Sequence, residues 1–171
     1  PDLIINEDLS AFNVGIERIA SLTKGKVFLC KEEGRDLEVK NYESYDFKGP
    51  HPAGLAGTHM HFLDPPSTNK IVWSIGYQDV LAIGRLFLTG FLDPERTISI
   101  CGPLAKSPRI IKTYLGASLD DLLDDEILNE VPCRVISGSV LSGNIAENEL
   151  AFLGRYARQV TLIREDREKI S

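Results

Sequence analysis

The chain is poor in the residues that mark several classes of protein. Its 171 residues include three cysteines, three histidines, one methionine and one tryptophan. No apolar run approaches the roughly 20 residues of a transmembrane helix, and no signal-peptide pattern is present. Twenty-five acidic against nineteen basic residues give a net charge of −6. Because phosphate contacts need clustered lysine and arginine, this balance argues against nucleic acid as a partner.

The three cysteines suggest no metal or cluster motif. Cys30, Cys101 and Cys133 form no C-x-x-C pair, and each lies in or at the end of an apolar run. This placement is typical of reduced, buried thiols in a cytosolic protein. A metal or cluster at any of them would need ligands from a partner.

The first hundred residues alternate strand-like and helix-like segments. Apolar positions at helical spacing predict helices over 9–19, 54–63 and 77–88. Apolar and β-branched runs predict strands over 3–5, 27–30, 42–47, 71–75 and 96–101, with Trp73 in the core. The first strand, helix and strand would form a βαβ unit with parallel strands. The pattern is typical of an α/β layer on a largely parallel sheet.

A strand-dominated unit follows. Strands are predicted over 109–115, 133–137, 140–141 and 159–164, and one short helix over 117–123, where Ser118 and Asp121 fit a capping box. We place the boundary near residues 94–103, which divides the chain into domains 1–100 and 101–171. Since the chain begins at Pro1 without an initiator methionine, we expect a fragment of a longer polypeptide.

Candidate chemistry gathers between Lys48 and Asp64, a run that holds all three histidines. His59 and His61 face the same side only in a strand, so a metal site with His51 is disfavoured. Bonding of loop backbone or helix capping is the favoured role of these histidines, and contact with a partner or polar ligand remains open.

The other motifs are unspecific. Gly54 and Gly57 could open a helix toward an anion, but the stretch lacks both G-x-G-x-x-G and a Lys-Ser/Thr ending. The small residues of 136–143 suit tight turns between strands, and close packing and turns are the favoured role of both glycine-rich stretches. The acidic cluster of 120–126 lacks calcium-loop spacing and predicts an exposed helix face. No catalytic residue and no self-contained active site is predicted.

The stretch Gly49–Phe62, GPHPAGLAGTHMHF, is similar to the matching stretch of the A subunit of the sodium-translocating NADH:quinone oxidoreductases. The similarity continues in order over most of the chain, at 77–84, 86–90, 102–103, 108–109, 115–119, 134–143, 153–156 and 162–165. Several motifs in one order make coincidence a poor explanation.

The resemblance implies a peripheral subunit on the cytoplasmic face of the bacterial inner membrane. The complex couples NADH oxidation and ubiquinone reduction to sodium ion export, and this chain's partners would be its other subunits. The implied fold is the C-terminal part of a Rossmann-like α/β domain, followed by a small α+β domain of the β-grasp (ubiquitin-like, soluble-ligand-binding) type.

The same resemblance implies that this chain carries no redox cofactor. Flavins, iron–sulfur centres and the NADH site would belong to other subunits, since the chain lacks the flavin-binding glycine signature and the cysteine quartet of a related flavin-carrying protein. We expect the isolated fragment to be inactive, with a docking role and a quinone contact. A quinone head needs an apolar slot with hydrogen-bond donors, and the candidate residues are His51, His59, His61, Phe62, Gly54 and Gly57.

Two alternatives compete with this interpretation. One is a pure assembly module without any substrate contact. The other is an independent oxidoreductase that binds flavin or NADH in the α/β layer.

Overall fold

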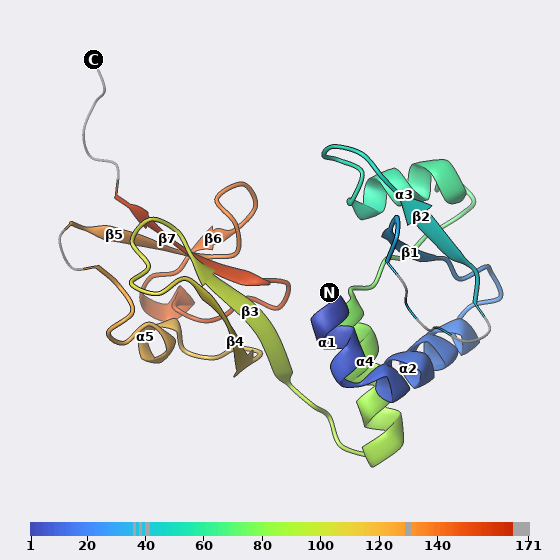
Figure 1. The fold of residues 1–171 in the computed structure, drawn as a ribbon, viewed down its shortest axis with the longest axis horizontal. Helices are drawn as coiled ribbons and strands as arrows, with labels where there is room; N and C mark the ends of the chain where they lie inside the picture. The colour runs from blue at the N-terminus through green and yellow to red at the C-terminus, as the bar shows by residue number, and fades with distance from the viewer. Residues whose placement is uncertain (36, 38, 40–41, 129–130, 166–171) are drawn as a thin grey trace. The chain divides into compact units, whose positions relative to one another are not determined.

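The structure is a computed structural model, and it describes residues 1–165 apart from 36, 38, 40, 41, 129 and 130. The chain divides into two compact units, Pro1–Asp93 and Pro94–Ser171 (Figure 1). This division lies at the N-terminal edge of the expected boundary region, 94–103. The strand Glu95–Cys101 belongs to the second unit, because it pairs with strands there. Both units mix helices and strands, as the predicted α/β class requires.

The first unit is centred on two helices of 13 residues, α2 (Leu9–Ser21) and α4 (Tyr77–Thr89), with the short α1 (Asp2–Glu7) beside them. Both long helices were predicted from apolar spacing. Gly90 ends α4 in a left-handed conformation at φ 79°, which glycine adopts without strain. The core of this unit contains Ile5, Ala11, Phe12, Ile16, Val80 and Leu81.

Helices α2 and α4 pack with their backbones in close contact. A Cβ atom added at Gly84 would lie 1.7 Å from the carbonyl oxygen of Ala11, and one added at Gly15 would lie 2.1 Å from that of Val80. Real Cβ atoms essentially never come within 3.0 Å of another heavy atom. Glycine at both crossing positions therefore sets the short distance between the two helices.

An ionic contact joins the start of α2 to α4 and to the residues that follow α4. Asp8 caps α2 by accepting a hydrogen bond from the backbone N–H of Ala11 at 3.0 Å, and its other carboxylate oxygen accepts one from Nε of Arg85 at 3.0 Å. Arg85 also donates to Asp93 at 2.7 Å. Burial works against the charge of Arg85, but these hydrogen bonds outweigh it and raise its pKa. The cap and the end of α4 are thus held by one side chain.

The sheet of the first unit is smaller than expected. It consists of β1 (Leu29–Glu32) and β2 (Ser44–Phe47), which pair in parallel. Residues 3–5, predicted as a strand, lie in α1, so the βαβ prediction is wrong. Three apolar residues do not distinguish a strand from a helix, and here Ile5 packs on the core formed by α2 and α4.

The strand predicted over 71–75 is also wrong, because these residues adopt neither a helix nor a strand. Ile71 is 82% exposed and Trp73 89% exposed, so the placement of Trp73 in the core is wrong too. A strand needs a partner for its backbone groups, and the segment lies in the green connection that leads from α3 (Ala56–Leu63) to α4 (Figure 1).

The second unit is a five-stranded mixed sheet in the order β4-β3-β7-β5-β6. Its elements are β3 (Glu95–Cys101), β4 (Arg109–Tyr114), α5 (Leu119–Leu122), β5 (Cys133–Ser137), β6 (Asn144–Ile145), the 3₁₀ helix Asn148–Leu150 and β7 (Gln159–Arg164). The central strands β3 and β7 are parallel and the other pairs are antiparallel. This topology is that of a β-grasp, as the resemblance implied.

One helical turn closes the core of this sheet. Ser118 caps α5 by accepting a hydrogen bond from the N–H of Asp121 at 3.2 Å, as predicted. The core residues are Ile98, Ile100, Leu104, Ala105, Leu119, Leu123, Ala146, Leu153, Val160 and Leu162. The strand predicted over 140–141 is wrong: these residues form a turn, and β6 begins at Asn144.

Candidate functional site

The predicted site lies in the loop that precedes α3 and in α3 itself. The loop is folded by two backbone hydrogen bonds, from Ala53 to Pro50 and from Leu55 to Pro52. Thr58, in the first turn of α3, donates to the carbonyl of Pro52 at 2.9 Å. No residue of α3 is buried. Four of its eight residues are exposed, Ala56, Gly57, His61 and Phe62, and the other four are half-buried.

His59 has a structural role in this loop. Its Nε2 lies 2.8 Å from the carbonyl oxygen of Ala53, within hydrogen-bond distance. Its ring also packs on Phe47 at the end of β2, with the centroids 4.1 Å apart. Both contacts use the ring, and His59 therefore connects the loop, α3 and the small sheet.

His51, His61 and Phe62 are exposed instead. His61 meets the ring of Phe62 edge-on at 5.1 Å, and 72% of Phe62 is accessible to solvent. His51 lies in the exposed turn before α3. Since His59 and His61 occupy one helix, their rings diverge, and the structure does not bring the three histidines together as ligands. Among the described residues, no group of three His, Cys, Asp or Glu is placed to hold a metal ion.

The two glycines of the site are not required by packing. A Cβ atom at Gly54 or Gly57 would meet nothing within 4 Å. The second glycine-rich stretch differs, because Gly138 has φ 111° and a Cβ on it would lie 2.8 Å from Gly143. The prediction of tight turns is thus confirmed for 138–143, whereas Gly54 and Gly57 leave open surface.

The cysteines are all free and half-buried. Burial raises the pKa of the thiols of Cys30 and Cys133, which lowers the fraction of reactive thiolate. Their environment fits the structural role that the sequence indicated.

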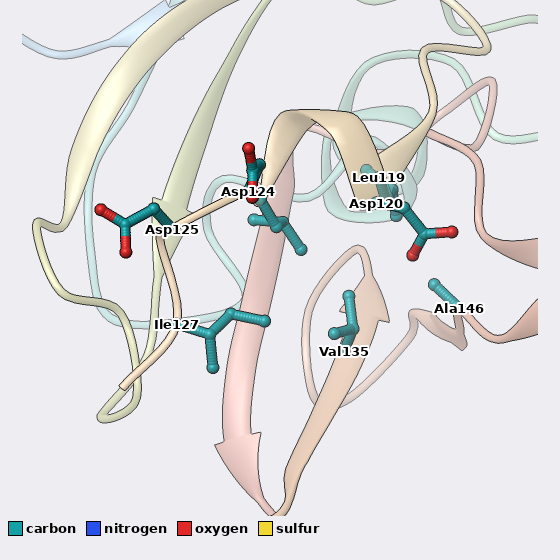
Figure 2. A pocket seen from close by; sticks show the side chains of 8 residues that line it. Leu119, Asp120, Asp124, Asp125, Ile127, Val135 and Ala146 are labelled. Carbon is teal, nitrogen blue, oxygen red and sulfur yellow. The ribbon is translucent and has the colours of Figure 1, made fainter. Parts of the chain in front are cut away.

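A pocket of about 410 Å³ lies in the second unit beside α5. Its lining combines apolar and acidic side chains, Leu119, Asp120, Leu123, Asp124, Asp125, Ile127, Val135 and Ala146. Figure 2 shows the three carboxylates pointing in different directions rather than converging. Lys106 holds the pKa of Asp125 below its usual value through a hydrogen bond. The predicted exposed helix face is correct for Asp120 and Asp121 only, because α5 ends at Leu122 and the later acids lie in the following turn.

One exposed feature of the first unit was not predicted from the sequence. Ile71, Trp73 and Ile75 recur at every second position and are all exposed. The alternation is visible in the sequence, but the same pattern is produced by a buried strand. Only the structure therefore shows that these three side chains are exposed.

Comparison with known proteins places the whole chain in one family. Residues 1–92 match the family model described as the NqrA second alpha/beta domain, and residues 97–148 match the NQRA C-terminal domain. The chain is 53% identical over 173 residues to the A subunit of the Na(+)-translocating NADH-quinone reductase of Vibrio alginolyticus. It is 54% identical to that of Vibrio parahaemolyticus and 51% identical to that of a Marinomonas strain.

These alignments cover 99% of this chain and 38% of each relative. The chain thus spans well under half the length of the curated relatives it matches. Within the part of the chain that the structure describes, no helix has the length and apolar character that crossing a bilayer demands. The matched domains and the identity show that the chain belongs to the NqrA family, the A subunits of the Na⁺-translocating NADH-quinone reductases.

Proposed function

We propose that this chain is a docking part of the NqrA subunit in a Na⁺-translocating NADH-quinone reductase, at the cytoplasmic face of the membrane. The observation that carries the proposal is identity of 51–54% to three such subunits over 99% of the chain. The relatives' names supply the activity, and the chain would take part in it only within the complex. The other subunits are its partners.

We infer further that electrons do not pass through a cofactor of this chain. The proposal rests on the chemistry of its side chains: the three cysteines are separate, half-buried thiols, and His59 is engaged with Ala53 and Phe47. Flavins and iron–sulfur centres would be held by other subunits, where they supply the electron transfer. Flavin absorbance in the purified chain at one equivalent would overturn this and favour an independent oxidoreductase.

A chimera tests the docking role. The matched 173 residues of the Vibrio alginolyticus protein would be replaced by this chain, and the complex would be purified from membranes. We expect the chimera to be retained with the other subunits and to sustain sodium-dependent quinone reduction. A complex that assembles and works equally well with the matched segment deleted would contradict the proposal.

A second role, contact with the quinone, is supported by the exposed surface of α3. Phe62 and Leu55, which is 49% exposed, offer apolar area, and His61 and His51 offer N–H donors for quinone carbonyl oxygens. His59 is less suited, because its ring is already engaged. We propose that another subunit supplies the opposite wall of the slot, with Gly54 and Gly57 leaving space for close approach.

The test uses the chimeric complex with His61 and Phe62 both replaced by alanine. Because both side chains are exposed, the fold is retained, and we expect the KM for ubiquinone to rise about tenfold, as loss of about 1.4 kcal/mol of binding would produce. Reduction of an artificial acceptor at the NADH site should stay unchanged. The matched control is Phe91→Ala, since Phe91 is 79% exposed in the same unit. An unchanged KM for ubiquinone would contradict the quinone contact and favour a pure assembly module.

A further inference from the structure

The segment Ile71–Ile75 presents an unusual apolar surface. Ile71 is 82% exposed, Trp73 89% and Ile75 46%. Residues two apart share one face of a strand, so these three large side chains would line one face if the segment were extended. Val72, between the first two, is half-buried. Large exposed apolar side chains that share one face are a feature of interaction sites.

Both ends of the segment are anchored within the first unit. Before it, Ser67 and Lys70 exchange two backbone hydrogen bonds of 3.1 Å, and Lys70 forms an ion pair with Asp64. After it, α4 begins at Tyr77 and is fixed to α2 through Gly84 and the core. The five residues between these anchors have the usual length of a strand and are rich in β-branched and aromatic types.

The segment nevertheless pairs with no strand among the described residues. A strand-forming sequence, held at both ends and unpaired, matches the peptide side of β-strand addition, in which backbone hydrogen bonds give affinity and alternate side chains fill apolar pockets. Such pairing requires a free sheet edge with apolar side chains beside it, which the alternate side chains of the segment can contact.

The length of the relatives leaves room for such an edge outside the matched region. They are much longer than this chain, since the match covers only 38% of each of them. The family model matched by residues 1–92 describes a second α/β domain, and the described residues of the first unit form two short paired strands, β1 and β2. A sheet formed by the rest of the relatives' polypeptide could supply the edge with which Ile71–Ile75 pairs.

We propose that Ile71–Ile75 becomes a strand by pairing with a sheet edge in the part of the NqrA polypeptide outside the matched region, and that Ile71, Trp73 and Ile75 are buried in that contact. The proposal rests on family membership and on the exposed segment. It is independent of the quinone contact and of activity, so failure of either leaves it standing.

Hydrogen exchange measured by mass spectrometry tests the pairing. We compare the chain alone with the full-length chimera in the Vibrio alginolyticus protein, using the peptide that contains 71–75. Exchange of these amides should slow at least about 100-fold in the chimera, while α4 is protected in both proteins. Equal exchange in both would overturn the proposal. Protection of the chain alone that grows with concentration would assign the edge to a second copy and overturn it too. Protection gained only when the other subunits are added would assign the edge to one of them and would also overturn the proposal.

A substitution sharpens the test. Trp73→Glu should leave α4 protected in the chain alone, because Trp73 is exposed there, but should restore fast exchange of 71–75 in the chimera. Leu22→Glu is the matched control, since Leu22 is 83% exposed in the same unit and lies outside the segment; its chimera should keep the protection. If the chimera shows no protection of α4 and so fails to fold, the same comparison between the native Vibrio alginolyticus protein and its own matched segment decides the question.

Discussion

The two units of this chain bury their apolar residues to different extents. In the second unit, five strands pair with one another and cover ten core residues together with α5. In the first, six core residues lie mainly between helices, and large apolar side chains such as Phe62, Ile71 and Trp73 remain 72–89% exposed. The second unit thus forms the larger core from its own residues, although side chains such as Leu141 and Tyr156 are exposed there too. What distinguishes the first unit is that the exposed apolar residues of one short segment, Ile71, Trp73 and Ile75, recur at every second position.

This difference has a consequence for function. Because the strands of the second unit and α5 enclose its core, substitutions in that core should affect folding. The first unit combines a tightly packed pair of helices with exposed segments, α3 and Ile71–Ile75. Substitutions in the helices should therefore affect stability, and substitutions in the exposed segments should affect assembly and quinone binding.

The largest effect is expected in the core of the second unit. Leu162 is fully buried in the central strand β7, and Leu162→Ala should lower the free energy of unfolding by about 3–4 kcal/mol through lost burial and a cavity. Hydrogen exchange of β7 would measure it. Leu141→Ala, at a 92% exposed position of the same unit, should change it by less than about 0.5 kcal/mol. Comparable losses in both variants would contradict the assigned core.

The helix crossing of the first unit comes next. Gly84→Ala places a methyl group where the backbone of Ala11 lies, and we expect a loss of about 3 kcal/mol, measured by exchange of α2 and α4. The exchange of β7 should not change, because it lies in the other unit. Gly57→Ala is the matched control: it lies in α3 with open space around it, and alanine there should stabilise by about 0.5–1 kcal/mol. Equal destabilisation by both variants would argue against a close crossing.

The sequence predicted some parts of this structure and not others, for physical reasons. Helices α2 and α4 have apolar residues at helical spacing along their whole length, and β7 alternates between apolar and polar residues, so each carries enough residues to fix its period. Residues 3–5 and 140–141 are too short for that. At 71–75 the pattern did indicate a strand, but the sequence does not show whether a pairing edge exists within the same chain.

For the candidate site, the sequence predicted the position but not the role of each histidine. The density of histidine and glycine located the exposed loop and α3. It did not separate the engaged His59 from the exposed His61, because the contacts of His59 with Ala53 and Phe47 depend on how the loop folds against β2.

A smaller loss is expected from the cap that joins the ends of the two helices. Asp8→Ala removes the acceptor for Ala11 and one partner of Arg85, and should destabilise the first unit by about 1–2 kcal/mol. Asp8→Asn keeps the cap acceptor and removes the charge, so it should lose less than half as much. Chemical denaturation followed by exchange of α2 would measure both. Equal losses would mean that the charge of Asp8, rather than its capping hydrogen bond, provides the stabilisation.

The smallest effect concerns the exposed pair that ties β4 to the turn after α5. Arg109 donates two hydrogen bonds to Glu126, at 2.6 and 2.7 Å, and this bonding lowers the pKa of Glu126 from its ordinary 4.5. A carboxyl group with a lowered folded-state pKa stabilises the fold above its unfolded pKa, and the contribution disappears as the pH falls through the folded value. The stability difference between the parent and Arg109→Gln should therefore be present at pH 7 and vanish well below pH 4.5.

A side-chain NMR titration of Glu126 measures this directly. In the parent the carboxyl group should titrate at a lower pH than in Arg109→Gln, because the variant loses the charged donor. The pair is exposed to solvent, so salt screens it. Raising the ionic strength to about 1 M should accordingly move the parent curve toward that of the variant. Coincident curves at low salt would show that the ion pair does not persist in solution and contributes nothing to the stability of the second unit.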